Sequence, residues 1–502
     1  MFSNPTAVTF IGYLVLMVSV GVFAYRYTRN YSDYILGGRS LGGIVTALSV
    51  GASDMSGWLL MGLPGAVFLS GISEAWIAVG LILGSWLNWN LVAARLRVYT
   101  EKTHNALTLP DYFTHRFEDD KNLLRIISAL VILIFFTIYC ASGVVAGARL
   151  FENTFEMPYE TALWVGAVAT ILYVFFGGFL AVSWTDTIQA ALMCIALIVT
   201  PIAVMSDLGG FTSATDAVAT VNPAMLDIMR GQNFIGIVSL LAWGLGYFGQ
   251  PHILVRFMAA RSIAVIPNAR RVGILWMFFC LAGAVGVGFF GSAYFAAHVD
   301  QAALVTENHE RVFIVLSGVL FNPWIAGVLM SAILAAVMST LSCQLLVCSS
   351  TLTEDFYRSF LRPRATQREL VWVGRSMVLL ISVLAVWMAR DPDSLVLSLV
   401  SYAWAGFGAA FGPVILMSLW WRRMTRNGAL AGIVTGAVTV LVWNHFAWFG
   451  LYEILPGFVF GIAAIVIVSL LDKAPSKRVA DQFTEVERIV RDRTASTEAA
   501  AS

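Results

Sequence analysis

The sequence predicts an all-α polytopic membrane protein with about 13 transmembrane helices. Hydrophobic residues make up 59% of the 502 residues and charged residues only 12%, whereas a soluble domain is about a quarter charged. Apolar runs close to the length that a helix needs to cross the hydrocarbon core, about 20 residues, recur along the whole chain. The expected spans are 6–25, 43–68, 73–94, 126–148, 162–177, 186–205, 233–256, 272–296, 325–350, 371–389, 394–420, 427–448 and 454–472.

The positions of Lys and Arg predict the orientation of these spans. Of the 31 basic residues, all but Arg149, Arg230, Arg311 and Arg390 fall in alternate loops and in the tail. These loops include one with Arg26, Arg29 and Arg39 and another with Arg256, Arg261, Arg270 and Arg271. An odd number of spans then places the N-terminus outside the cell. We expect one membrane domain over 1–472 and a partly disordered cytoplasmic tail over 473–502.

Several function classes are disfavoured by the composition. A formal net charge of +1 offers no electrostatic surface for nucleic acid. The 6 histidines form no recognisable motif with a Ser, Cys or acidic partner, so an intramembrane enzyme is a poor match. Too few residues follow the last span for a fused signalling domain. We expect no cofactor and no obligatory protein partner, only the surrounding lipid bilayer.

Two of the expected spans are interrupted by glycine and polar residues. "SVGASDMSGW" interrupts the second span and "WGLGYFGQP" the seventh. Glycine and proline both destabilise helices, and in hydrocarbon a freed backbone group is tolerated only where protein or a water-filled cavity receives it. The breaks are five helices apart, so the second set of helices is inverted, and this pattern indicates a transporter's central site. Alternatively, the glycines only permit close helix packing.

At these motifs the chain resembles the sodium:solute symporter family. The similarity is carried by "DYILGGRSLG", "TALSVGASDMSGW", "FFGGFLAVSWTDTIQA", "LGYFGQPHILVRFMAA", "ILAAVMSTLSCQLLVCSS" and "SYAWAGFGAAFGPV" and extends to about Ser476. The resemblance implies a leucine-transporter-type inverted five-helix repeat, with 43–205 and 233–420 as its halves. It also implies sodium-coupled uptake of L-proline by alternating access, across the inner membrane of a bacterium. A family member that carries another small organic solute remains the alternative.

A sodium site is expected where the first break meets the ninth span. Sodium is a hard cation that takes oxygen ligands. Ala336, Ser339 and Thr340 are spaced i, i+3 and i+4, which aligns them on one helix face. The family resemblance implies that sodium binds the carbonyls of Ala52, Met55 and Ala336 and the hydroxyls of Ser339 and Thr340. Alternatively, the hydroxyls bond back to carbonyls one turn earlier.

Three charged residues are expected to assist ion movement. A central charge such as Asp54 costs about 2.5–3.5 kcal/mol on insertion scales, so we expect it to attract the cation, with helix capping as the alternative. The family resemblance supports the first role and implies that Asp186 acts in sodium release and Arg39 at the cytoplasmic gate. The alternatives are an N-cap for Asp186 and a positive-inside anchor for Arg39.

The substrate site is expected between the two breaks. The half-helix after the first break directs backbone donors and its positive dipole end at the proline carboxylate, near Ser56 and Gly57. Trp243 and Tyr247 offer aromatic faces to the ammonium and ring. The family resemblance implies that Tyr139 and Pro251 also line the pocket, with Gln250 a weaker candidate. The alternative is that these aromatic residues only pack.

Overall fold

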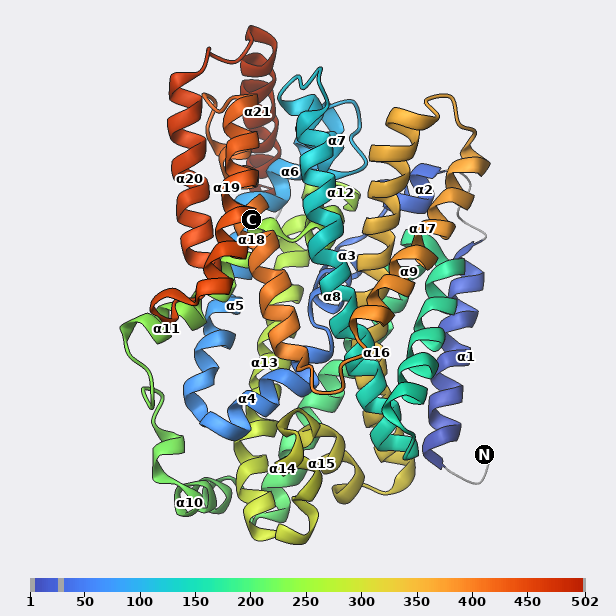
Figure 1. The fold of residues 1–502 in the computed structure, drawn as a ribbon, viewed down its shortest axis with the longest axis vertical. Coiled ribbons are helices and arrows are strands. Elements are labelled where there is room, and N and C mark those ends of the chain that lie inside the picture. The colour runs from blue at the N-terminus through green and yellow to red at the C-terminus, as the bar shows by residue number, and fades with distance from the viewer. Residues whose placement is uncertain (1–4, 26–30, 500–502) are drawn as a thin grey trace.

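The computed structural model is an all-helical bundle (Figure 1). It describes residues 5–25 and 31–499, and it describes the side chains of all of these residues except 24–25, 171–177 and 493–499. Arg26 and Arg29 lie outside the described residues. The α-helices are α1 Pro5–Tyr25, α2 Tyr31–Leu36, α3 Gly43–Asp54, α4 Leu63–Ser70, α5 Ala75–Asn88, α6 Ala94–Lys102, α7 Leu109–Arg116, α8 Leu123–Phe155, α9 Tyr159–Asp207, α10 Phe211–Val221, α11 Phe234–Leu241, α12 Pro251–Ala259, α13 Ile266–Ala297, α14 Ala303–Glu307, α15 Val312–Leu320, α16 Pro323–Ser350, α17 Gln367–Met388, α18 Val396–Trp420, α19 Arg426–Phe446, α20 Ile454–Leu471 and α21 Lys477–Ala499. Short 3-10 or π segments named here are η1 Gly37–Arg39, η2 Trp58–Gly62, η4 Trp89–Ala93, η6 Ala242–Gly249, η7 Ile263–Val265, η9 His309–Arg311 and η10 Thr351–Leu361.

The number of membrane-capable helices is close to the expected number. Ten helices in the described residues are long and apolar enough to cross a membrane, and two bent pairs raise the total to twelve. The span expected at 162–177 falls in the first part of α9, which continues through Gly178 (φ 68°) into the next expected span. Its residues 171–177 are among the side chains that are not described. The expected total of 13 is therefore not confirmed.

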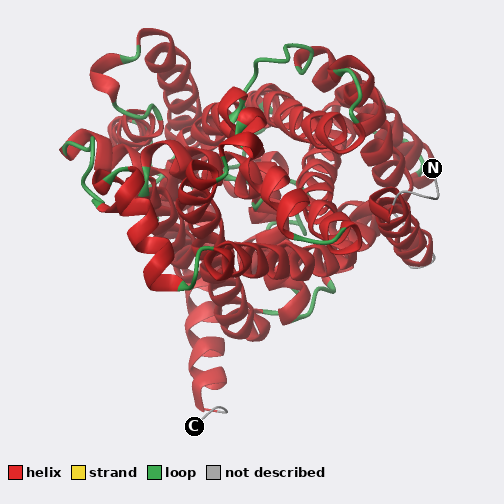
Figure 2. Ribbon diagram, turned by 90° about the horizontal axis from the view of Figure 1, so that it is seen from below, coloured by secondary structure: helices red, strands yellow, loops and turns green. Residues whose placement is uncertain are grey.

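The helices pack side by side as a bundle, which Figure 2 shows from one end, and they differ in how much of each is buried. In the span that contains α16, 89% of the most apolar stretch is buried, whereas the corresponding share in α1 is only 28%. Helix α16 packs against α8, α9, α1 and α17, and α18 packs against α8, α19, α20 and η6. Consequently α16 has the position of a central scaffold helix, while α1, α19 and α20 face the surroundings.

Both interrupted helices break where the sequence predicts. Helix α3 ends at Asp54, and the chain turns by 63° before η2 and α4 continue. The α11–η6 segment ends at Gly249 and meets α12 at 45°. Met55 (φ −80°, ψ 84°) and Gln250 (φ −78°, ψ 109°) leave helical geometry at the two breaks, and Pro251 starts the second half-helix. The glycine-rich motifs therefore do more than permit close helix packing, because both helices are broken there.

Helix α5 and segment η6 touch backbone to backbone. A Cβ added to Gly84 would lie 2.1 Å from the Gly244 carbonyl oxygen, and one added to Gly244 would lie 2.2 Å from the Gly80 carbonyl oxygen. No larger residue fits at these positions without separating the two elements. The side chain of Asn88 adds a hydrogen bond of 3.0 Å to the Tyr247 carbonyl. Helix α5 is thus closely fixed to the second broken helix.

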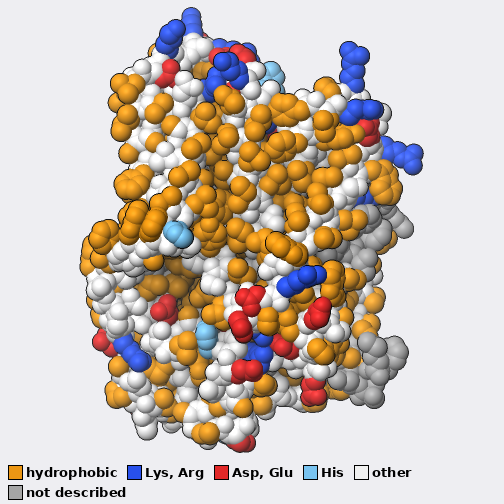
Figure 3. Space-filling view, in the orientation of Figure 1, with side chains coloured by type: hydrophobic (Ala, Val, Ile, Leu, Met, Phe, Trp, Pro, Cys, Tyr) orange, Lys and Arg blue, Asp and Glu red, His pale blue; other side chains and the backbone are white. Residues whose placement is uncertain are grey.

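The two ends of the bundle differ in charge. Figure 3 shows Lys and Arg gathered at the end that holds α2, α7 and α21, and Asp and Glu gathered towards the end that holds α4 and α14. We call the first the basic end. Between them, apolar side chains cover the surface. This distribution agrees with the alternation of basic loops in the sequence.

The C-terminal tail, which the sequence predicts to be partly disordered, is helical over Lys477–Ala499. Helix α21 packs against α6 and η7 at the basic end, where Val479, Phe483 and Val486 are buried. Lys102 Nζ lies 2.7 Å from Glu485 Oε1. The expectation of partial disorder rests on the polar composition, whereas these apolar positions, spaced i, i+4 and i+7, give one buried helix face.

An ion-paired group fixes α7 at the basic end. Arg125 donates from Nη2 to Asp111 Oδ1 at 2.7 Å and from Nη1 to Asp355 Oδ1 at 3.4 Å. Burial raises the pKa of Asp111, but the hydrogen bond from His115 and the charge of Arg125 outweigh it and hold that pKa below its ordinary value of 3.8. Asp111 is therefore a stable anion at neutral pH.

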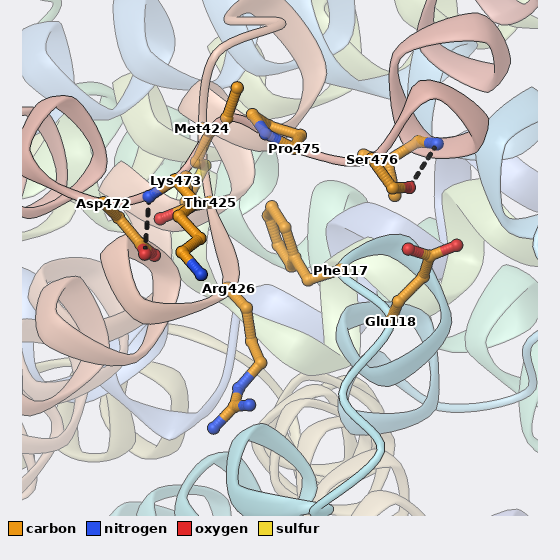
Figure 4. A pocket seen from close by; sticks show the side chains of 11 residues that line it. Phe117, Glu118, Met424, Thr425, Arg426, Asp472, Lys473, Pro475 and Ser476 are labelled. Carbon is orange, nitrogen blue, oxygen red and sulfur yellow. Dashed lines mark hydrogen bonds between the residues drawn. The ribbon is translucent and has the colours of Figure 1, made fainter.

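A pocket of about 190 Å³ opens nearby, between the α7–α8 loop, the start of α19 and the α20–α21 linker (Figure 4). Arg426 and Lys473 line it together with Glu118 and Asp472. Arg426 Nε lies 3.2 Å from Asp119 Oδ1. The pocket thus contains both signs of charge in equal number.

Candidate ion and substrate site

Four of the five expected sodium-ligand residues meet at the first break. Ser339 Oγ donates to the Ala52 carbonyl at 2.8 Å and to the Ala336 carbonyl at 3.1 Å. Thr340 Oγ1 donates to the same Ala52 carbonyl at 3.2 Å. All of these residues are buried. Residues almost 290 positions apart in the chain are thus joined through one carbonyl oxygen at the end of α3.

The back-bonding alternative accounts for only part of this geometry. Ser339 does bond back to Ala336, three residues earlier, but it also reaches across to α3. The hydrogen bond of the Thr340 hydroxyl crosses to α3 instead of returning to its own helix. Met55, the fifth expected ligand, is buried next to this cluster in sequence, and its N–H donates to the Gly51 carbonyl at 2.9 Å. The cluster supplies carbonyl and hydroxyl oxygens, which are the ligands that a hard cation prefers.

Asp54 connects the two broken helices. Its Oδ2 accepts a hydrogen bond from the Tyr247 hydroxyl, and within the described residues its Oδ1 has no partner. The carboxylate caps neither half-helix; instead, Ser56 Oγ accepts from the Trp58 N–H at 3.4 Å at the start of the second half. The capping alternative therefore does not describe Asp54 in this structure, and its electrostatic role stays a prediction.

Aromatic residues from η6 surround this connection. The Tyr247 ring packs edge-on against Trp404 at 5.2 Å, and the Trp243 ring lies 6.3 Å from Trp58 and 5.5 Å from Tyr452. The Trp404 indole donates to the Trp243 carbonyl at 2.7 Å. These aromatic side chains pack against one another, as the packing alternative predicts, and they also border the break.

The remaining expected substrate residues are close-packed in this arrangement. A Cβ at Gly57 would lie 2.6 Å from that of Ala146, so α8 touches the backbone of the break. Tyr139 on α8 packs edge-on against His252 at 5.9 Å. Pro251 lines a cavity on the side of α12 facing Thr108 and Thr351. The cavity shared by Asp54 and Tyr247 has only about 10 Å³, room for one water molecule, so this structure is closed around the site.

Asp186 is not an N-cap, because it lies inside α9, well after the kink at Gly178. Its Oδ2 accepts from Ser49 Oγ at 2.7 Å and from Arg256 Nη2 at 3.1 Å, and Cys343 Sγ lies 3.7 Å away. The carboxylate thus joins α3, α12 and α16 through side chains that are almost wholly buried.

Arg256 is the main residue that the sequence reasoning missed. It was expected in a cytoplasmic loop, but α12 extends past it and its side chain is only 1% exposed. A buried arginine needs a counter-charge, which Asp186 provides. The signal was available, because an arginine five residues after Pro251 in "PHILVRFMAA" falls on an otherwise apolar half-helix.

Arg39 joins η1, the segment just before α3, to the end of α12. Its guanidinium donates to the Met258 carbonyl at 2.5 Å, to the Ala106 carbonyl at 2.9 Å and to Asn105 Oδ1 at 2.7 Å. Beside it, the Leu41 N–H donates to the Ala259 carbonyl at 3.2 Å. Burial and, to a smaller extent, Arg97 lower the pKa of Arg39 to about 10, so it stays charged at neutral pH. These contacts exceed those of an ordinary surface anchor.

A second missed residue closes the opposite end. Glu310 in η9 accepts hydrogen bonds from the first N–H groups of α18, at 2.9 Å from Val396 and 3.0 Å from Leu397. Burial raises the pKa of Glu310, although these two N–H groups act in the other direction. A carboxylate in a loop gives no sequence signal for this contact, because its partner is 86 residues away.

Comparisons with known proteins agree with this architecture. Residues 34–436 match the sodium:solute symporter family. The chain is 66% identical to the sodium/proline symporter of Escherichia coli (strain K12), over 97% of each chain, and 51% identical to the high-affinity proline transporter PutP of Bacillus subtilis (strain 168), over 94% of this chain and 99% of that one. It shares its fold, at 18% identity and a TM-score of 0.81, with the outward-open structure of a Na⁺-coupled sialic acid symporter, covering 95% of this chain and 100% of that one. The fold is that of the leucine-transporter-type symporters, and the chain belongs to the sodium:solute symporter family.

Proposed function

We propose that this protein is a sodium-coupled symporter that takes up L-proline by alternating access. Both relatives described above, at 66% and 51% identity, are named as proline carriers. The observation that carries the proposal is the cluster of oxygens around the Ala52 carbonyl, in which Ser339 and Thr340 of α16 meet the first break. A sodium ion in this cluster would use the lone pairs of the same hydroxyl and carbonyl oxygens.

Coupling follows from the position of Ala52. Its carbonyl lies at the end of α3, two residues before Asp54, and the half-helix that follows begins near Ser56 and Gly57. An ion bound at Ala52, Met55, Ala336, Ser339 and Thr340 would fix the break in one geometry. The backbone donors of the half-helix would then be oriented for a carboxylate. In this way sodium raises the affinity for proline, and proline raises that for sodium by the same factor.

The second broken helix supplies the apolar part of the substrate site. Tyr247 holds Asp54 from the opposite repeat, and Trp243 lies beside Trp58 of η2. When the two breaks separate, Tyr139, Trp243, Tyr247 and Pro251 would enclose the proline ring and its ammonium group. The closed packing seen here corresponds to a state of the cycle with little space for a substrate.

Release takes place at the basic end, in our proposal. Asp186 binds Arg256 and Ser49, and Arg39 binds the end of α12. Both groups of contacts connect the broken helices to each other or to the scaffold, so both must open before sodium and proline leave. Asp186 would offer the departing cation its carboxylate when Arg256 moves away.

We further propose that the basic end is cytoplasmic and that the protein lies in the inner membrane of a bacterium. The positive-inside rule supports this orientation, as does the charge distribution in Figure 3. It places the N-terminus outside and α21 in the cytoplasm. The halves 43–205 and 233–420 would then be the inverted repeats that move against each other.

The energy available per cycle is adequate for uptake. One sodium ion gains about 2.3 kcal/mol from 100 mV and about 1.4 kcal/mol from a tenfold gradient. The sum of about 3.7 kcal/mol supports an accumulation of several hundredfold.

Uptake by purified protein in liposomes tests the proposal. We expect accumulation of labelled L-proline only with an inward sodium gradient, and competition by unlabelled L-proline. Strong competition by pantothenate, a sugar or another amino acid, with weak competition by proline, would indicate the alternative substrate. Equal uptake without sodium would contradict symport.

A further inference from the structure

A groove on the outer face of the bundle lies between α5 and α13. It has a volume of about 550 Å³ and is lined by Ile82, Trp86, Arg270, Arg271, Ile274, Leu275 and Phe278. The residues from α5 are spaced i and i+4, and those from α13 repeat at i+3 and i+4, so each set lies on one helix face. Both helices belong to candidate membrane spans, and the groove therefore faces lipid.

The groove is apolar along its length and cationic at the basic end. Leu275 is 59% exposed and Phe278 51% exposed, which in water would be an unfavourable apolar surface. Arg270 and Arg271 lie in the first turns of α13, next to these side chains in sequence. Arg270 donates to the side-chain oxygen of Asn90, and the Asn90 amide donates to the Trp86 carbonyl at 2.6 Å. Arg270 is thus tied to the α5 side of the groove.

In the part of the chain that the structure describes, the two arginines have no counter-charge. Within the described ranges, neither guanidinium lies within ion-pair distance of a carboxylate. The sequence explains this, because residues 75–100 and 263–297 contain no Asp or Glu. The pocket of Figure 4 differs in this respect, since Glu118 and Asp472 accompany its basic residues.

We propose that this groove is a binding site for an anionic phospholipid of the leaflet at the basic end. The phosphate of the head group would lie between Arg270 and Arg271, since guanidinium groups bind phosphate oxygens in pairs. The acyl chains would follow Ile82, Ile274, Leu275 and Phe278. Trp86 lies beside the chains, close to the polar region that indole prefers. Basic pockets between transmembrane helices at the cytoplasmic side are known to bind such head groups.

The position of the groove gives this lipid access to the transport machinery. Helix α13 packs against α3 and α4, the two halves of the first broken helix, and α5 packs against η6. A lipid that bridges α5 and α13 would therefore bind two elements that touch the two breaks.

Brominated lipids test the proposal through Trp86. The full-length protein and its Trp86→Phe variant are reconstituted in phosphatidylcholine with increasing amounts of dibrominated phosphatidylglycerol or dibrominated phosphatidylcholine. The difference in fluorescence between the two proteins reports quenching of Trp86 alone. We expect half-quenching by the glycerol lipid at a mole fraction about thirtyfold lower, the ratio that two cationic side chains near the surface produce. Inorganic phosphate at millimolar concentration should not reduce this preference for the glycerol lipid.

Charge variants separate the site from general surface charge. Arg270→Gln with Arg271→Gln should bring the ratio to about one, and Arg271→Gln alone to about fivefold. Lysine at both positions keeps the charge but not the paired donors of guanidinium, and should retain only part of the preference. As the matched control, Arg364→Gln with Arg368→Gln removes two exposed arginines elsewhere at the surface, one in the loop before α17 and one in its first turn, and should leave the ratio unchanged.

Two outcomes would overturn the proposal. One is equal quenching by both lipids in the unaltered protein, which would mean that the groove holds only non-selective boundary lipid. The other is an unchanged preference after Arg271→Gln, a variant that removes an exposed side chain with no described partner and should fold even if the double variant does not.

Discussion

Replacing Ser339 by alanine together with Thr340 by valine removes both hydroxyls that meet at the Ala52 carbonyl. In the proposed sodium site these are two of five ligands. A hydrogen-bonding contact to a charged group is worth about 1.5–3 kcal/mol. Because water replaces part of each lost contact, the lower value applies, and the two changes together weaken sodium binding by about 3 kcal/mol. We therefore expect the half-saturating sodium concentration to rise roughly a hundredfold.

The same variant also loses the two hydrogen bonds seen here between α16 and α3. Each neutral bond contributes about 1 kcal/mol to stability, so a folding defect is a competing explanation for reduced uptake. The two effects are separable, because a folding defect lowers the amount of active protein without changing its sodium dependence.

The assay is initial uptake of labelled L-proline by proteoliposomes over a wide range of sodium concentrations. Ser331→Ala is the matched control, since Ser331 lies on the same helix, is buried and bonds to the Gly327 carbonyl at 2.8 Å. It should leave the half-saturating sodium concentration unchanged. If the Ser339 and Thr340 variant also retains the original value, the sodium site is not located at these hydroxyls.

Further predictions concern buried contacts elsewhere in the protein. Arg256→Gln leaves the Asp186 carboxylate buried without its charge partner and should destabilise the protein by about 3–5 kcal/mol; adding Asp186→Asn should recover part of this in thermal unfolding. Gly57→Ala brings a Cβ to 2.6 Å from that of Ala146, so we expect a loss of about 1–3 kcal/mol in stability and of proline uptake, and normal uptake would contradict the close contact. Because the pKa of Asp111 is lowered in the folded protein, its contribution to stability is complete above its ordinary value of 3.8 and is lost as the pH falls through the lower folded value. Asp111→Asn should therefore reduce the melting temperature at pH 7, and the difference should shrink at strongly acidic pH; a constant difference would refute the assignment.

The sequence was sufficient for the class of fold and for the two breaks. Apolar runs define the spans, and the glycine and polar residues of "SVGASDMSGW" and "WGLGYFGQP" identify the positions at which backbone groups are freed. The helical spacing of Ala336, Ser339 and Thr340 also gave the face that meets α3. These features are local in the chain, and a periodic pattern records them.

The long-range pairs could not be predicted in the same way. Nothing in the local pattern joins Asp186 to Arg256, or Glu310 to the start of α18, because each pair depends on how distant helices pack. The helix of the tail was missed for a similar reason, since the apolar face of α21 is stabilised by its contacts with α6 and η7. These three features therefore depend on tertiary contacts that a local pattern does not record.

The direct backbone contact between α5 and η6 has a mechanical consequence. Gly84 and Gly244 leave no side chain between the two elements that could slide or change rotamer. If η6 tilts in the transport cycle proposed above, α5 has to tilt with it, and the membrane-facing surface of α5 then moves against the surrounding acyl chains. Bilayer thickness and lateral pressure would thus act on the transport rate through a helix that does not itself touch the substrate.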